Sequence, residues 1–407
     1  MTSTAFGTNT KCDVLILGAG VVGLATGIAL LESKPFLKVI IAEKEKDVAL
    51  HASGRNSGVL HAGFYYSPDS LKAKFCRDGN FELRKLAKKY SIPVREVGKV
   101  VVVRSSDELA RLHTLYERGI SNGVDLEVLP ESELFKYEPL AVTHKRFLWS
   151  PTTAVSDPKA IVVAMLKEFI SMGGKVEYGK NIALEMRGGQ VCVSSNEYEP
   201  IHIINAAGAQ ADRLSRSVGV ANEYAMLPFM GVYRTTDERS LPLQRLVYPV
   251  PHPINPFLGV HLTLTVDRKV KIGPTAIPIA GREQYSFFEG WSGPDISQAL
   301  KGMISLIRGD SHDFGAILRT EWPKLIPSML VKESTALVPA AGSVGRWYRK
   351  SPGIRAQLVH LPSGKLEQDF VVSSSANATH VLNAVSPGWT SSIPFGKYIC
   401  NVVTKKL

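Results

Sequence analysis

The sequence predicts an α/β fold in which one parallel-sheet domain is interrupted by an inserted, sheet-based α+β domain. Three observations predict it. An apolar run at 14–17 leads into a glycine-rich turn and a helical stretch, and similar strand–turn–helix units follow 201–204 and 380–385. Because such units build parallel sheets, their wide separation indicates that other material is inserted between them. The 407 residues leave room for this, since domains commonly have about 150 residues.

The first unit carries a dinucleotide-binding motif. Gly18, Gly20 and Gly23 form a Gly-x-Gly-x-x-Gly turn, and the β-like run 37–42 ends in Glu43, 20 residues after the last glycine. The glycines let the backbone approach a pyrophosphate at a helix N-terminus, and the acid accepts a hydrogen bond from a ribose hydroxyl. The motif predicts a Rossmann-like domain. One weaker alternative is a glycine-rich turn in an unrelated α/β protein. The other is a nicotinamide enzyme, because a single strand–turn–helix unit of this kind also fits that class.

The segments between these units have recognisable patterns. Amphipathic spacing predicts a helix over 71–90, and Asp157-Pro158 opens a helix that closes at 173–174. A strand is expected over 98–104 and a helix over 107–122, with a Gly188-Gly189 hairpin turn further on. The stretch 226–342 is rich in prolines and β-like segments, including 257–266 and 270–273, and reads as the inserted domain.

Composition and charge exclude several classes of protein. With 44% hydrophobic and 21% charged residues, the chain is neither disordered, collagen-like nor a coiled coil. The four cysteines lie far apart without a Cys-x-x-Cys pair, which predicts a reducing compartment and no metal site. The net charge of +11 favours anionic partners, but the basic cluster 346–350 lacks a nucleic-acid-binding motif, so no nucleic acid is expected.

The N-terminal region predicts a cytoplasmic protein. Residues 1–10 show neither a secretory signal nor a transit peptide, and the uncharged stretch 14–31 contains the glycine motif, which argues against a membrane span. Contact with a membrane would therefore be peripheral, and the basic cluster 346–350 is the candidate for it.

A second signature follows Glu43. The segment 51–66 reads His-Ala-Ser-Gly-Arg-Asn-Ser-Gly-Val-Leu-His-Ala-Gly-Phe-Tyr-Tyr. Together with the glycine motif, it resembles the L-2-hydroxyglutarate dehydrogenase/oxidase family of the FAD-dependent D-amino-acid-oxidase superfamily. Further matching stretches are 70–76, 257–262, 272–274, 353–357, Ser386-Pro387 and Thr390-Ser391. The chain departs from the family with Thr275 where asparagine is frequent, and with Gly388-Trp389 where two alanines are frequent.

The resemblance implies a flavin lying between an FAD-binding domain and a substrate domain. We expect the FAD-binding domain to be discontinuous, over 11–95, 153–225 and 343–407, and the substrate domain to cover 96–152 and 226–342. The implied cofactor-binding residues are Gly18, Gly20, Gly23, Glu43, Lys44, Ser53, Arg55, Asn56, Ser57, Ala207, Gly208, Pro387, Gly388, Thr390 and Ser391.

The implied reaction is oxidation of a small dicarboxylate, L-2-hydroxyglutarate, to 2-oxoglutarate. It requires a base for the hydroxyl proton while a hydride passes to the flavin. His61 and His261 are the candidate bases, because histidine titrates near physiological pH, and His61 is favoured. A structural role remains the alternative for either residue.

The substrate carboxylates require cations. Arg355 offers a bidentate fork to one of them, with an interdomain salt bridge as the alternative, and Tyr66 or Tyr65 offers a hydrogen bond, with packing as the alternative. The second carboxylate needs another cation, and the sequence does not choose among Lys72, Lys74 and Arg282.

The sequence is also compatible with other functions. A related flavoenzyme would act on another hydroxy acid, an amino acid, an amine or glycerol phosphate, whereas a flavin-bearing binding protein would have no turnover. The electron acceptor is expected to be quinone or oxygen. His51 lies in a His-x-x-Gly segment that in some relatives carries covalent FAD, although non-covalent FAD is the favoured interpretation.

Overall fold

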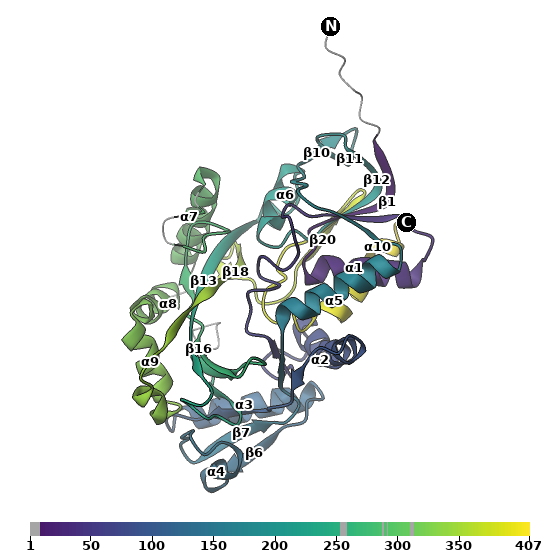
Figure 1. Ribbon diagram of the computed structural model, residues 1–407. Coiled ribbons are helices and arrows are strands. Elements are labelled where there is room, and N and C mark those ends of the chain that lie inside the picture. The colour runs from purple at the N-terminus through teal and green to yellow at the C-terminus, as the bar shows by residue number, and fades with distance from the viewer. Residues whose placement is uncertain (1–8, 253–258, 287–288, 291, 310–312) are drawn as a thin grey trace.

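The computed structural model describes residues 9–252, 259–286, 289–290, 292–309 and 313–407. Two large sheets organise this part of the chain (Figure 1). A six-stranded sheet carries the N- and C-terminal segments, and a ten-stranded sheet carries most of the middle of the chain. The predicted α/β fold with an inserted sheet-rich part is confirmed.

The six-stranded sheet is built around the glycine motif. Its strand β1 is parallel to its neighbours β2 and β12, and β21 is parallel to β12, whereas the edge strand β20 is antiparallel. Residues 14–17 are buried because helices and a hairpin cover the two faces of the sheet, as expected for a parallel sheet. In order, the strands are β20 (Val372–Ser375), β21 (Ala378–Val381), β12 (Tyr198–Asn205), β1 (Thr10–Leu17), β2 (Val39–Ala42) and β9 (Lys175–Glu177).

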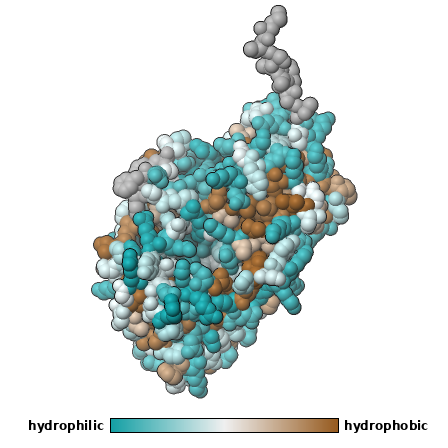
Figure 2. Space-filling model, viewed as in Figure 1, coloured by the Kyte–Doolittle hydropathy of each residue, from teal (hydrophilic) through white to brown (hydrophobic). Residues whose placement is uncertain are grey.

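Four helices share an apolar core with one face of this sheet: α1 (Val21–Ser33), α2 (Leu71–Lys89), α5 (Pro158–Ser171) and α10 (Ser392–Thr404). Capping explains where two of them begin. Asp157 accepts hydrogen bonds from the backbone N–H of Lys159 at 2.8 Å and of Ala160 at 3.2 Å, and Ser70 accepts from Ala73 at 3.1 Å. Hydrophobic residues gather over α5 on the face shown in Figure 2, while hydrophilic residues cover most of the remainder.

The opposite face packs against the hairpin of β10 (Leu184–Arg187) and β11 (Gln190–Val193). The predicted Gly188-Gly189 turn joins these strands, with φ of +54° and +78°, which glycine adopts without strain. The short helices η2 (Gly208–Gln210) and α6 (Ala211–Ser217) follow β12, as the strand–turn–helix pattern predicts.

The ten-stranded sheet is mostly antiparallel. Only the pair β14–β5 is parallel among its described strands. In order, its strands are β19 (Lys365–Leu366), β18 (Tyr348–His360), β13 (Tyr224–Asp237), β16 (Lys269–Gly273), β15 (His261–Leu264), β14 (Leu246–Pro249), β5 (Lys99–Val102), β7 (Arg146–Ser150) and β6 (Glu127–Pro130), while β17 (Ile277–Pro278) pairs with β13.

Helices flank this sheet (Figure 1). A three-stranded sheet contributes Val59 and Val155 to the apolar core of the ten-stranded sheet and Leu60 and Ala154 to the core of the six-stranded sheet. The helices are α3 (Glu108–Ser121), η1 (Glu131–Glu133), α4 (Leu134–Tyr137), α7 (Gly293–Arg308), α8 (Asp313–Glu321), η3 (Trp322–Leu325), α9 (Pro327–Thr335) and η4 (Pro339–Ser343). The strands of the three-stranded sheet are β3 (Val59–Leu60), β8 (Ala154–Ser156) and β4 (Val94–Arg95).

Strand β18 belongs to the ten-stranded sheet. It lies in the segment 343–407, which is expected to belong to the FAD-binding domain, and it pairs with β13 along nearly its whole length. Its alternating apolar residues fit either sheet, so the pattern alone does not choose its partner. The predicted strand at 380–385 ends at Val381, and of the predicted strand at 257–266 the first two residues lie outside the described part.

Candidate active site

A cavity of about 750 Å³ lies at the carboxyl ends of β1, β2 and β12. Ligands of parallel α/β sheets bind at this edge, where the turns after the strands converge. The wall also includes 353–356 from β18 and the loop 384–390, so both large sheets contribute to it. Its volume and position suit a cofactor as large as a dinucleotide.

The glycine turn is shaped for close backbone approach. Gly18 has a φ of +103°, and a Cβ placed on Gly23 would lie 2.0 Å from the Gly18 carbonyl oxygen, so α1 packs directly on the turn. Helix α1 has no acidic residue in its first turn, which leaves its N-terminal dipole available for an anionic group. The observed turn therefore fits the pyrophosphate of a dinucleotide.

Glu43 follows β2, as the motif predicts, and its carboxylate helps to hold the turn. One oxygen accepts from the backbone N–H of Ala19 at 2.7 Å and the other from Glu45 at 2.9 Å. Ser53 Oγ accepts from the N–H of Val21 at 3.1 Å, which ties the second signature to the start of α1. Both side chains belong to residues that line the cavity.

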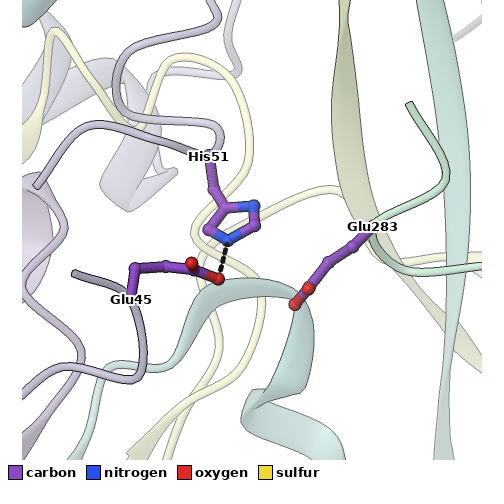
Figure 3. Close-up of side chains that lie close together, drawn as sticks. All are labelled: Glu45, His51 and Glu283. Atoms are coloured by element: carbon purple, nitrogen blue, oxygen red, sulfur yellow. Dashed lines mark hydrogen bonds and ion pairs between the residues drawn. The ribbon is translucent and has the colours of Figure 1, made fainter. Parts of the chain in front are cut away.

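An ionic cluster lies at the cavity wall beyond Glu43. The carboxylate of Glu45 lies 2.9 Å from His51 Nε2, and Glu283 faces them from the other half of the protein (Figure 3). Lys44 Nζ lies 2.6 Å from Glu45 Oε1 and 2.8 Å from Glu283 Oε1. Hydrogen bonds from Lys44 and then His51 lower the pKa of Glu45 to about 2. The lysine therefore supplies the positive charge of this cluster.

Both ring nitrogens of His51 have partners. Nδ1 lies 2.7 Å from the Tyr285 hydroxyl, and Nε2 contacts Glu45 and the Lys44 ammonium. The Arg55 guanidinium covers the Tyr285 ring at 4.0 Å from its centre. This network gives His51 a structural place at the cavity wall.

The loop after β3 carries His61, which is 8% exposed and lines the cavity. Its backbone N–H contacts Thr390 Oγ1 at 3.4 Å, and Asn80 donates to its carbonyl oxygen at 3.1 Å. Its Nδ1 has no hydrogen-bond partner within the described residues. Burial and then the charge of Lys99 hold the pKa of His61 well below its ordinary value, so its imidazole is neutral near pH 7.

His261 comes from β15 and does not itself line the cavity. Its Nδ1 contacts the Gly259 carbonyl oxygen at 2.9 Å, an arrangement that places a proton on Nδ1 and leaves Nε2 as an acceptor. The ring stacks on Tyr248, with 3.8 Å between ring centres. Burial lowers the pKa of His261 to about 3, opposed by the hydrogen bond to Gly259.

Arg355 lies on β18 and lines the same cavity. Its charge contributes to the lowered pKa of both His61 and His261, which places the three groups in one neighbourhood. Tyr66 is not itself a lining residue, but its hydroxyl is hydrogen-bonded to Ser386, which lines the cavity, and burial raises the pKa of Tyr66 well above its ordinary value. Tyr65 is buried beside Phe64.

Thirteen of the fifteen implied cofactor residues line the cavity. The two others lie behind it. Gly23 packs on the Gly18 carbonyl, and Ser391 is fully buried at the start of α10. The structure thus brings together segments that are separated by more than 300 residues in the sequence, including His61 and Thr390.

Of the three candidates for a second substrate cation, Arg282 lines the cavity, but its guanidinium is already paired, whereas Lys72 and Lys74 are not lining residues. Arg282 is held by Asp212 and Asp295, Lys72 lies over the Phe370 ring at 5.7 Å, and Lys74 is exposed on α2.

Two buried lysines near the site, Lys99 and Lys271, are not among the residues predicted from the sequence. Lys99 begins β5, and Lys271 lies in β16 with its Nζ 3.3 Å from the Ser57 carbonyl oxygen. For Lys99, the sequence feature that could have indicated this is its position directly before the apolar run 100–103, because a lysine inside such a strand is rarely buried unless it is paired.

Comparison with known proteins shows the family of the chain. The family described as FAD dependent oxidoreductase matches residues 13–402. The L-2-hydroxyglutarate dehydrogenase of Salmonella houtenae is 34% identical over 408 residues, covering 96% of this chain and 93% of that protein. The mitochondrial L-2-hydroxyglutarate dehydrogenase of Homo sapiens is 31% identical, covering 97% and 89%.

Solved structures show the same fold at lower identity. L-alpha-glycerophosphate oxidase from Mycoplasma pneumoniae, whose structure has FAD bound, superposes with a TM-score of 0.74 at 22% identity, over 97% of this chain and 95% of that one. Glycine oxidase from Geobacillus kaustophilus gives a TM-score of 0.72 at 17% identity, over 98% and 95%.

The fold, the dinucleotide-sized cavity and the family match define an FAD-dependent oxidoreductase. The predicted cofactor and enzyme class are confirmed. Within that class, the chain belongs to the L-2-hydroxyglutarate dehydrogenase family. None of the helices in the described part of the chain is long and apolar enough to cross a membrane.

Proposed function

We propose that the protein oxidises L-2-hydroxyglutarate to 2-oxoglutarate. The observation that carries the proposal is the convergence of His61 and Arg355 on the wall of the cavity that the glycine turn opens. When bound, FAD supplies the acceptor for the hydride that leaves C2 of the substrate. The family relationship supports this substrate, because relatives over nearly the whole chain carry its name.

The residues divide the remaining chemistry. Arg355 binds the carboxylate next to the reacting carbon, and its planar guanidinium fixes the orientation of that carbon. His61 accepts the hydroxyl proton, since its lowered pKa keeps the imidazole neutral and ready to act as a base. His261 is the alternative base through Nε2. Replacing the true base with glutamine is expected to slow flavin reduction by about 10²–10⁴-fold.

The cofactor contacts are part of the same proposal. The glycine turn holds the pyrophosphate, Glu43 the ribose, and the segments around Ser57, Gly208 and Gly388 surround the remainder of the cofactor. The six-stranded-sheet half then forms the FAD-binding domain and the ten-stranded-sheet half the substrate domain. FAD is held non-covalently, since both ring nitrogens of His51 already have partners.

Anaerobic mixing tests the function. The purified yellow protein is mixed with L-2-hydroxyglutarate, its D enantiomer, L-lactate and glycerol 3-phosphate while the visible flavin absorbance is followed. Rapid bleaching by L-2-hydroxyglutarate alone is expected. Bleaching by another compound instead would assign that substrate, and no bleaching by any of them would refute the proposal.

The electrons pass on to quinone or oxygen, and we propose peripheral contact of a cytoplasmic protein with a membrane for the quinone route. Arg346, Arg349 and Lys350 are exposed at the start of β18, and the Arg346 guanidinium lies 4.8 Å from the centre of the exposed Tyr348 ring. Neutralising the three charges should reduce activity with vesicle-embedded quinone while dye-linked activity is retained. Equal activity in both assays would contradict this role.

A further inference from the structure

Lys99 is a buried amine without a counter-ion among the described residues, and burial lowers its pKa to about 7, so a carboxylate beside it would favour the charged form. The residue is 0% exposed, and its Nζ has no hydrogen-bond partner and no ion pair among the residues that the structure describes. Three aromatic rings surround it, with the nitrogen 4.3 Å from the centre of Tyr248, 4.9 Å from Tyr65 and 5.1 Å from Phe64. Cation–π contacts offset only part of the cost of burying a charge.

The strand register directs Lys99 to the same side of the sheet as the active site. Lys99 pairs with Leu246 and Val101 with Tyr248, so Lys99 and Tyr248 share one face of the sheet. Val247 pairs with Leu262, which sets His261 opposite Tyr248 on that face.

The same face continues to the cavity wall. His261 pairs with Gly273 and Arg234 with Ile272, so Tyr233, next to Arg234, lies on the same face and lines the cavity. Lys99, Tyr248, His261 and Tyr233 therefore follow one another across the sheet towards the flavin site.

The loop that carries His61 closes over the ammonium from the other side. Phe64 and Tyr65 lie three and four residues after His61, and their rings contact Lys99 Nζ. The charges of both Lys99 and Arg355 contribute to the lowered pKa of His61 and of His261. The two candidate bases are thus close to two different cations, which come from strands on either side of β15, Arg355 from β18 and Lys99 from β5.

This arrangement matches a substrate with two carboxylates. An isolated buried charge is costly, whereas the same charge beside a carboxylate forms a charge-assisted hydrogen bond. The Tyr65 hydroxyl also lacks a partner within the described residues and is a second donor in this pocket. Lys271 is less suited, because its ammonium already donates to the Ser57 carbonyl oxygen.

We propose that Lys99 binds the distal carboxylate of the dicarboxylate substrate, while Arg355 binds the carboxylate next to the reacting carbon. The assignment rests on the proposed function and makes Lys99 the residue that selects dicarboxylates over monocarboxylates. Selectivity follows because a monocarboxylate of the same length leaves the buried ammonium without a partner.

The test compares glutarate with pentanoate, which have the same chain length and differ in one carboxylate. Neither has a hydroxyl group to oxidise, so their binding to the holoenzyme is read from the flavin visible spectrum without turnover. The wild-type protein should bind glutarate at least ~10²-fold more tightly than pentanoate. Lys99→Met should weaken glutarate binding by ~10²-fold and change pentanoate binding by less than about twofold.

Two matched variants serve as controls. Lys72→Met removes another buried lysine that lies over an aromatic ring, Phe370, and should leave the preference for glutarate unchanged. Loss of the preference in Lys271→Met but not in Lys99→Met would overturn the assignment. Equal weakening of glutarate and pentanoate in Lys99→Met would overturn it as well.

Further measurements distinguish a loss of folding, or a failure of the proposed function, from a failure of the Lys99 assignment. FAD content and circular dichroism establish that a variant is assembled, and Lys99→Gln replaces Lys99→Met under the same criterion if the latter does not hold FAD. Failure of both variants to hold FAD would assign Lys99 to folding and overturn the proposal. If L-2-hydroxyglutarate is not oxidised at all, the proposed function fails, while the glutarate titration still decides the role of Lys99.

Discussion

Arg282 was a candidate for binding substrate, and the structure predicts that its loss affects stability instead. Its guanidinium lies 2.8 Å from Asp295 Oδ1 through Nε and 3.1 Å from Asp212 Oδ2 through Nη2. The side chains of Arg282 and Asp212 are 2% and 0% exposed. Because Asp212 belongs to α6 in the six-stranded-sheet half, this ion pair joins the two halves of the protein. We predict that Arg282→Met destabilises the fold and leaves substrate affinity unchanged.

The magnitude follows from the partners that remain. Removing one member of a buried ion pair costs about 3–5 kcal/mol, because the other charge is left uncompensated. Asp212 keeps Arg216 at 3.0 Å and the N–H of Met226 at 3.3 Å, which favours the lower end, about 3 kcal/mol. With about 2.1 cal/mol/K of unfolding entropy per residue, a chain of 407 residues loses roughly 3–4 °C in Tm.

Two assays on the FAD-loaded protein check this prediction. Thermal unfolding followed by circular dichroism should show the decrease in Tm, and steady-state assays with an artificial dye should give a KM for L-2-hydroxyglutarate within about twofold of wild type. Arg239→Met is the control, because Arg239 pairs with Asp237 at the surface and is 93% exposed. A tenfold or larger rise in KM without a change in Tm would refute the structural role of Arg282.

Three further predictions follow from the site. Gly23→Ala should abolish FAD binding, because its Cβ would lie 2.0 Å from the Gly18 carbonyl oxygen. Gly345→Ala should keep the wild-type flavin absorbance per protein, because its Cβ would meet no atom of the described residues within 4 Å. Acid precipitation of the wild-type protein should leave all flavin in the supernatant, and yellow colour in the pellet would instead indicate a covalent bond to His51. The pKa of His261 is lowered to about 3, so the folded state binds fewer protons than the unfolded state below pH 6.5. The contribution of His261 to stability is complete above pH 6.5 and is lost as the pH falls towards 3. Urea unfolding should therefore give about 2 kcal/mol less stability at pH 5 than at pH 7. The stability of His261→Asn should depend less steeply on pH.

The sequence alone was sufficient for the parts of the protein that depend on local geometry. Strand β1, the glycine turn and α1 are contiguous, and Glu43 follows at a fixed distance, so spacing predicts a nucleotide site without any knowledge of distant residues. The caps at Ser70 and Asp157 likewise act within a few residues of the helices that they start. The family and the cofactor followed from these local motifs.

Pairing between distant segments was decided only by the tertiary structure. The apolar pattern of β18 is compatible with either large sheet, and its placement beside β13 depends on long-range hydrogen bonds that no local pattern specifies. The same holds for Arg282, whose charge suited a carboxylate ligand in the sequence but is satisfied by Asp212 and Asp295 in the fold.

Lys99 shows most clearly what the sequence determined and what the fold added. The sequence determined that a lysine stands at the start of a strand of valines, and propensity alone would leave its charge in solvent. The fold buries it between Tyr248 on the sheet and Tyr65 on the loop after His61, which are 183 residues apart in the chain. Whether a charge is solvated or buried depends on every neighbour that excludes water from it, and those neighbours meet only when the chain has folded.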